Sequence, residues 1–224
     1  MLDLSKSYEF FKPDAKTDRI HIIGCGSVGS TVAENLARCG VKNMTLWDFD
    51  VVEPHNIVNQ MFRQRDVGRP KAEALRDLLC EIDPDLSETV QVKPDGWKGE
   101  RLSGYVFLAA DSMEVRRAVV EKHFDNLNVK AMFDFRTLLT GAQHFAANWM
   151  DLRMKQDLQN SMQFSDDDAA AETPVSACGI TLGVAPTVRV ICALGVANFM
   201  NFWNGKPLKK LILVDAYDFH ITAF

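Results

Sequence analysis

The chain has 224 residues, of which 47% are hydrophobic, a size and composition that suit one α/β domain with a substantial core. Its formal net charge of −5 excludes a broad basic surface for nucleic acid. The polar start of the chain does not resemble a signal peptide, and we expect no apolar run long enough to cross a membrane.

The first part of the chain alternates short apolar strands with amphipathic helices. The predicted strands are 19–23, 43–47, 88–92, 105–110 and 130–135, and the predicted helices are 27–38, 71–81 and 113–122. Gly40 is a plausible C-cap for the first helix, and Asp83-Pro84 stops the second. This alternation predicts an α/β fold with a Rossmann-like, doubly wound and mostly parallel sheet.

The pattern changes after residue 140. A strand over 141–150 has no helix directly after it, and the polar stretch that follows predicts a long crossover loop over about 151–176. A long apolar helix over 184–203 has Pro186 in its first turn, where proline is tolerated. A terminal strand pair, 211–215 and 220–224, predicts an antiparallel extension of the sheet. We expect a single domain over 1–224.

A glycine-rich turn joins the first strand to the first helix. Gly24 permits the tight turn, Gly26 lets the backbone approach a phosphate, and Gly29 lets the helix pack closely on its strand. Ser27 and Val28 open the helix, whose free N–H groups and positive dipole end favour an anion. The alternative is a glycine-rich turn that binds no ligand.

Polar and cationic residues follow the second strand. Asp48 stands 19 residues after Gly29, where an acidic side chain usually accepts hydrogen bonds from ribose hydroxyls. The residues that follow within 23 positions are Asp50, Asn56, Gln60, Arg63 and Lys71. Hydride transfer has no use for such a cluster, whereas a reaction that expels pyrophosphate needs it, because charge develops on phosphate oxygens. For Lys71, the alternative is a solvated lysine in the first turn of a helix.

These motifs together resemble the ThiF–MoeB family, whose fold is shared by ubiquitin-activating enzymes and bacterial adenylyltransferases. The family pattern runs G-x-G-x-x-G, D-x-D, N-x-x-R-Q, D-x-G-x-x-K and an aspartate after the fourth strand. The chain matches it with Gly24/Gly26/Gly29, Asp48/Asp50, Asn56 and Gln60, Asp66/Gly68/Lys71, and Asp111. The similarity continues to the C-terminal helix and strand pair, and so covers most of the chain.

The resemblance implies roles for these residues. Lys71 would contact the phosphates, Asp48 would bind the ribose, and Asp111 would hold Mg²⁺ near the α-phosphate of ATP. The alternative for Asp111 is an N-cap of the following helix. The implied nucleotide-binding set is Gly24, Gly26, Ser27, Val28, Gly29, Asp48, Asp50, Asn56, Asn59, Gln60 and Lys71. A homodimer is expected from the resemblance alone.

The chain departs from the family pattern at three places, one of which is the absence of an arginine from residues 1–18. The arginine that precedes Gln60 in the family is Asn59 here, and a neutral amide cannot replace its charge. Arg63 is the expected substitute, ahead of Arg65, which lies further along the loop. The C-x-x-C pairs that hold zinc in many relatives are absent from the sequence, so we expect no structural zinc.

The five cysteines are scattered, which indicates reduced thiols and a cytoplasmic protein. Cys178 precedes the last long helix with a spacing similar to that of the reactive cysteine of thiamine-type relatives. A thiol at a helix start can have a lowered pKa and receive an acyl or sulfur group. The alternative is an inert buried cysteine, which is how we interpret Cys25 and Cys192.

The sequence therefore predicts an ATP- and Mg²⁺-dependent adenylyltransferase. It would transfer AMP to a carboxylate, expected to be the C-terminal glycine of a small ubiquitin-like or sulfur-carrier protein. Two alternatives stay open at this point. One is a nucleotide-binding interaction protein with weakened catalysis, which the neutral Asn59 favours. The other is an NAD-dependent oxidoreductase. Neither nucleic acid nor membrane is an expected partner.

Overall fold

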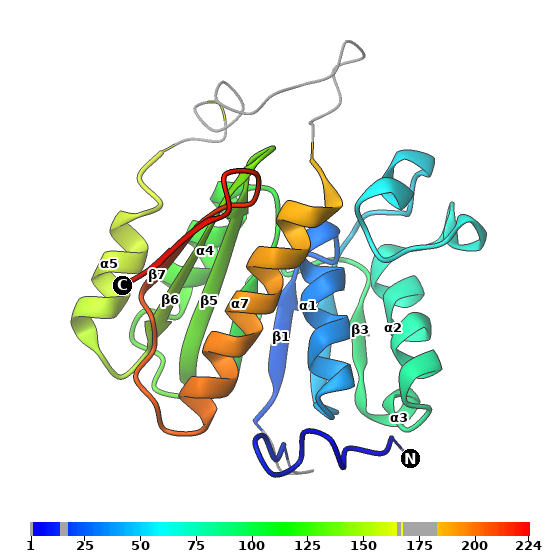
Figure 1. Cartoon of the computed structure of the whole chain (residues 1–224), viewed down its shortest axis with the longest axis horizontal. Helices are drawn as coiled ribbons and strands as arrows, with labels where there is room; N and C mark the ends of the chain where they lie inside the picture. Colours follow the sequence, from blue (N-terminus) through cyan, green and yellow to red (C-terminus); the bar gives the residue numbers. More distant parts are fainter. Residues whose placement is uncertain (1, 14–17, 165–166, 168–182) are drawn as a thin grey trace.

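An eight-stranded mixed sheet forms the centre of the molecule, in the order β3-β2-β1-β4-β5-β6-β7-β8 (Figure 1). The computed structural model describes residues 2–13, 18–164, 167 and 183–224. The strands are β1 Ile20–Ile23, β2 Met44–Trp47, β3 Gln91–Lys93, β4 Gly104–Leu108, β5 Val129–Thr137, β6 Gly141–Asn148, β7 Leu211–Asp215 and β8 His220–Ala223. The helices are α1 Ser27–Arg38, α2 Lys71–Ile82, α3 Leu86–Thr89, α4 Met113–Lys122, α5 Leu152–Asn160 and α7 Ala185–Trp203. Two short 3₁₀ turns, η1 Pro54–Val58 and η2 Gln64–Asp66, precede α2.

The sheet changes direction at β5. Strands β3, β2, β1, β4 and β5 pair in parallel, and β1, β2 and β4 are buried along their whole length, as expected for strands covered on both faces. Strands β5 to β8 pair antiparallel, because β5 and β6 follow each other without a crossover helix. The predicted α/β class, parallel half and antiparallel extension are thus confirmed.

Helices cover both faces of the sheet. Helices α1, α2 and α7 belong to one apolar cluster, and α4 and α5 contribute to a second cluster on the opposite face. Figure 1 shows α1 and α7 side by side across the front of the sheet. Because α1 opens at the glycine-rich turn, this pairing brings the start of α7 to the same end of the sheet.

We expected no apolar run long enough to cross a membrane, but α7 is long and apolar enough to do so. An 18-residue window of this 19-residue helix has a mean hydropathy of 1.2, which by length and composition alone is enough to span a bilayer. It packs instead on α1 and on β5, β6 and β7. Phe199 lies within the core, with edge-on contacts to the rings of Phe107 and Phe133. Its apolar character is therefore explained by its place in the core.

Two expectations about local structure were wrong. The predicted strand 88–92 begins as the short helix α3, which buries Leu86, and only Gln91–Lys93 is a strand. The predicted loop 151–176 opens with α5, because the Asp151 carboxylate accepts hydrogen bonds from the N–H groups of Arg153 and Met154 at 2.9 and 3.2 Å. Cys178 lies outside the described residues.

Candidate nucleotide-binding site

Of the three glycines in the glycine-rich turn, only Gly26 has room for a Cβ atom. A Cβ on Gly24, whose φ is +93°, would lie 2.6 Å from the Ala110 nitrogen, and one on Gly29 would lie 1.9 Å from the Gly24 oxygen. Both glycines are therefore required by close backbone packing. At Gly26 the nearest atom to such a Cβ would be the Gln60 Nε2, at 3.9 Å. The turn thus forms a cradle that has room for a further atom beside Gly26.

The start of α1 is suited to an anion. Gly26 is the N-cap and offers no side chain to the first N–H groups, and the first turn carries no acidic residue. The N–H groups of Ser27, Val28 and Gly29 are therefore left for another acceptor. A phosphate in the cradle would meet these N–H groups and the positive end of the helix dipole.

The Asp48 carboxylate organises the turn from the end of β2. Its Oδ2 accepts a hydrogen bond from the Cys25 N–H at 2.6 Å, and its Oδ1 accepts one from the Asp50 N–H at 2.8 Å. Burial raises the pKa of Asp48, while these two hydrogen bonds and Lys71 act in the opposite direction. Each carboxylate oxygen keeps a further lone pair, so Asp48 can also accept a bond from a ribose hydroxyl.

Lys71 is held towards this turn and is not the solvated lysine of the alternative interpretation. The residue is only 8% exposed, and its Nζ lies 2.8 Å from the Asp50 Oδ2. Its backbone N–H also donates to the backbone carbonyl oxygen of Asp50 at 2.8 Å. The side chain of Asp50 is 45% exposed, so solvent or a ligand can compete for the ammonium group.

Three amide side chains follow between β2 and α2. Asn56 is buried, and its Oδ1 accepts a hydrogen bond from the Glu53 N–H at 2.9 Å. Its side chain therefore shapes η1. Asn59 makes a long contact of 3.5 Å to the Gly183 carbonyl. Among the described residues the buried Oε1 of Gln60 has no hydrogen-bond partner. An unsatisfied amide oxygen beside Gly26 is a group that a ligand would satisfy.

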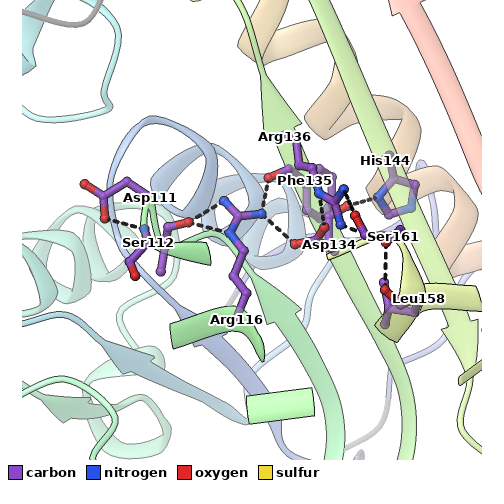
Figure 2. Close-up of polar contacts among 10 residues, drawn as sticks. Asp111, Ser112, Arg116, Asp134, Phe135, Arg136, His144, Leu158 and Ser161 are labelled. Atoms are coloured by element: carbon purple, nitrogen blue, oxygen red, sulfur yellow. Dashed lines mark hydrogen bonds and ion pairs between the residues drawn. The ribbon is translucent and has the colours of Figure 1, made fainter. Parts of the chain in front are cut away.

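The Asp111 carboxylate lies after β4, and its N-cap alternative is wrong. Ser112 is the N-cap of α4, since its Oγ accepts the Val115 N–H at 3.3 Å. The Asp111 carboxylate accepts the Ser112 N–H at 3.0 Å and is exposed. Figure 2 shows it pointing away from the Arg116 guanidinium. Because Ala110 packs against Gly24, the chain at Asp111 stands beside the glycine-rich turn.

A buried ionic network supports the chain before Asp111 (Figure 2), and the sequence analysis did not identify it. Arg116 donates from Nε to the Ala110 carbonyl at 2.7 Å and from Nη1 to the Asp134 Oδ1 at 2.5 Å. The second oxygen of Asp134, which is fully buried, accepts from the Arg136 Nε at 2.7 Å. Arg136 in turn donates to the carbonyl and hydroxyl of Ser161. The only sequence signal was three charges placed among core residues.

The structure contradicts the expectation for Arg63 and agrees with that for two of the cysteines. Arg63 and Arg65 both pair with Glu81, close to the C-terminal end of α2, whereas Lys71 begins that helix. Arg63 therefore does not join the cradle, because the loop turns its side chain towards Glu81. Cys25 and Cys192 are buried free thiols whose pKa values are raised by burial, in agreement with a packing role.

Comparison with known proteins places the chain in a family. The sequence is 40% identical over 67 residues to ubiquitin-like modifier-activating enzyme 5 of Caenorhabditis elegans, covering 30% of this chain and 16% of that protein. It is 37% identical over 86 residues to the molybdopterin-synthase adenylyltransferase of Escherichia coli strain K12, covering 38% of this chain and 34% of that protein.

The fold is similar to that of E. coli MccB crystallised with ATP. The TM-score is 0.73 with 18% identity, over 93% of this chain and 64% of that chain, so the likeness concerns the fold alone. The chain spans less than two thirds of each of these three proteins. The ThiF family model matches residues 9–224. The chain therefore belongs to the ThiF family, and its named relatives are enzymes of the adenylyltransferase and modifier-activating type.

Proposed function

We propose that this protein is an ATP-dependent adenylyltransferase that activates a carboxylate. The observation that carries the proposal is the convergence, at one end of the sheet, of an open glycine cradle, a buried ribose-type aspartate and a buried lysine. These groups come from the carboxyl ends of β1 and β2 and from the start of α2. Open α/β sheets bind their ligands at this edge.

The chemistry follows from what each group can do. The cradle N–H groups would hold a phosphate, and Asp48 would orient the ribose. A carboxylate oxygen of the acceptor would attack the α-phosphorus, the bond to the bridging oxygen would break, and pyrophosphate would leave with the electron pair. Lys71 would stabilise the charge that grows on the phosphate oxygens. Positioning and electrostatics are sufficient for this step, so it requires no side-chain nucleophile.

Asp111 is the proposed contact for Mg²⁺. Its exposed carboxylate lies beside the cradle. Among the residues that the structure describes, no three His, Cys, Asp or Glu side chains are grouped as a metal site. One or two carboxylates together with phosphate oxygens are the usual ligands of Mg²⁺, and Asp111 fits that arrangement. Bound Mg²⁺ would supply neutralising charge to the phosphates.

The acceptor we propose is the C-terminal glycine of a small ubiquitin-like or sulfur-carrier protein. The names of the two curated relatives, a ubiquitin-like modifier-activating enzyme and a molybdopterin-synthase adenylyltransferase, support this class. A homodimer, a cytoplasmic location and transfer of the acyl group to Cys178 belong to the same proposal.

Ligand-dependent stability distinguishes the proposal from its alternatives. ATP with Mg²⁺, at about 100 times its dissociation constant, is expected to raise the free energy of unfolding by about 2.7 kcal/mol. NAD is expected to have a smaller effect, because the polar cluster suits a triphosphate. ATP–pyrophosphate exchange with a carrier that ends in Gly-Gly then tests catalysis. Stabilisation by NAD and not by ATP contradicts the proposal, and ATP binding without exchange identifies the interaction protein with weakened catalysis.

Lys71→Ala tests the chemical step. The loss of one preorganised charge contact is expected to slow exchange by about 10²–10³-fold. The free energy of unfolding is expected to fall by up to about 1 kcal/mol, because Asp50 is half-exposed and can be hydrated once its partner is removed. Lys98→Ala is the matched control, since its exposed ion pair with Asp95 lies in the loop after β3. Equal exchange rates in both variants would remove Lys71 from the site.

A further inference from the structure

A guanidinium from α7 lies against the start of α1. The Arg189 Nη1 is 3.0 Å from the Thr31 Oγ1 and also contacts the Met61 sulfur. Thr31 donates its hydroxyl hydrogen to the Ser27 carbonyl at 2.8 Å, and the Met61 N–H donates to the Ser30 Oγ at 3.2 Å. Both partners of Arg189 are therefore bonded to the first turn of α1, whose N–H groups face the cradle.

The charge of Arg189 has no carboxylate counterpart within the described part of the chain. No ion pair involves it there, and its two contacts are a hydroxyl and a thioether, both neutral. Lys71, a cation held towards the nucleotide turn, is already engaged with Asp50, and Arg63 is turned away to Glu81. A guanidinium carries five N–H donors in a fork that matches phosphate oxygens, and a thioether is a weak acceptor for them.

The distance along the helix is short enough for a phosphate contact. Thr31 is one turn after Ser27, and a rise of 1.5 Å per residue puts the two about 6 Å apart along the α1 axis. Arg189 is half-buried, so part of the residue is open to solvent. Met61, which Arg189 contacts, stands two residues after Asn59, the neutral residue at the position where the sequence pattern expects an arginine.

We propose that Arg189 binds the β- and γ-phosphates of ATP and supplies the positive charge that Asn59 cannot provide. The proposal rests on the proposed function, because it requires a triphosphate in the cradle. It assigns to α7 a contact with the part of the nucleotide that leaves as pyrophosphate. Arg189 would then discriminate ATP from AMP, since AMP lacks the two phosphates it contacts.

Calorimetric titration of Arg189→Ala and Arg189→Lys with ATP plus Mg²⁺ and with AMP tests this assignment. A hydrogen bond to a charged group is commonly worth about a 10- to 100-fold change in affinity, so Arg189→Ala is expected to weaken ATP binding by that factor and AMP binding less than twofold. The lysine variant keeps a point charge and is expected to fall between. Arg38→Ala is the control, because its guanidinium pairs with Glu34 near the other end of α1.

The outcomes separate this inference from the proposed function. If the wild-type protein binds no ATP, the proposed function fails and Arg189 has no phosphate to contact. If the wild-type binds ATP and Arg189→Ala binds it equally well, only the role of Arg189 is overturned. An equal loss of ATP and AMP affinity would show that Arg189 merely packs against α1, which also overturns it. Recovery of ATP affinity in the double variant Asn59→Arg/Arg189→Ala would support the exchange of charge between the two positions.

Discussion

Two glycine-to-alanine substitutions in the cradle are expected to have different effects, one on nucleotide binding and the other on the stability of the fold. Gly26→Ala places a Cβ where the nearest atom is 3.9 Å away, so the fold has room for it. Gly29→Ala places a Cβ at 1.9 Å from the Gly24 oxygen and 3.2 Å from the Ile22 side chain, where there is no room. The two substitutions are chemically identical and lie three residues apart.

The expected magnitudes follow from these distances. Alanine is a poor N-cap compared with glycine, so Gly26→Ala should lower the free energy of unfolding by no more than about 1 kcal/mol. Gly29→Ala must shift the helix or the turn, and overpacking of this kind costs about 1–3 kcal/mol or more. At Gly26 the methyl group occupies the open side of the cradle. It should therefore remove most of the stabilisation by ATP.

Urea unfolding with and without ATP plus Mg²⁺ measures both effects in one series. Gly26→Ala should unfold near the wild-type midpoint and gain little from ATP. Gly29→Ala should unfold at clearly lower urea concentration. If Gly26→Ala gained as much from ATP as the wild-type, the phosphate would not lie in the cradle, and the reasoning from open space would be refuted.

Two further predictions concern buried charge. Arg116→Ala leaves the Asp134 carboxylate buried with Arg136 as its remaining ion-pair partner. Removing one partner of a buried ion pair typically costs about 3–5 kcal/mol of the free energy of unfolding, which a lower urea midpoint would measure. An unchanged midpoint would contradict a stabilising role for the network. Burial lowers the pKa values of His21 and His144 from 6.5 to about 4, so the folded protein holds both neutral while the unfolded chain binds protons. Stability should therefore fall as the pH drops from about 6.5 to about 4, by at most about 3 kcal/mol per histidine, and His144→Gln should flatten that fall.

Burial lowers the pKa of His144 against the opposing effect of Asp134, and the contact of its ring with Asn198 also favours the neutral form. Its Nδ1 lies 3.1 Å from the Asp134 carbonyl, to which it can only donate, and its Nε2 lies 3.3 Å from the Asn198 Nδ2. The Asn198 amide is fixed, because its Nδ2 donates to the Lys209 carbonyl and its Oδ1 accepts the Lys209 N–H. The neutral ring therefore has its Nε2 as acceptor, and a proton there would face another donor.

The elements that the sequence predicted best are those with a local signal at their ends. The bounds 27–38 and 113–122 agree with α1 and α4, because a glycine turn opens one helix and Ser112 caps the other. The polar composition of 151–164 concealed α5, whose inward face consists of Lys155 and Leu158 and whose cap is a single aspartate. The strand predicted at 88–92 was wrong in its first part, because a helical turn that buries Leu86 extends to Thr89.

Some residues of the candidate site could be predicted from the sequence and others could not. The cradle and Asp48 could be predicted because they lie within 25 residues on one strand–turn–helix–strand unit. Arg116 and Asp134 could not, because tertiary packing brings them together from α4 and β5. Arg189 could not, because it reaches α1 from α7. Arg63 is near Asn59 in sequence, but its side chain follows the loop to Glu81. Proximity in sequence was a poor guide wherever a loop decided the direction of a long side chain.

The position of Asp134 links the nucleotide end to the antiparallel half of the sheet. It pairs with Leu108 of β4 on one side and with Phe145 of β6 on the other, at the strand where parallel pairing gives way to antiparallel pairing. Its two carboxylate oxygens divide between Arg116, which holds the Ala110 carbonyl, and Arg136, which holds Ser161 after α5. The carboxylate is fully buried and each of its oxygens is bonded to a guanidinium group, so it holds both arginines in place. The chain at Asp111 is therefore fixed relative to β5, β6 and the end of α5, so any surface built on those elements has a defined position relative to the proposed Mg²⁺ contact.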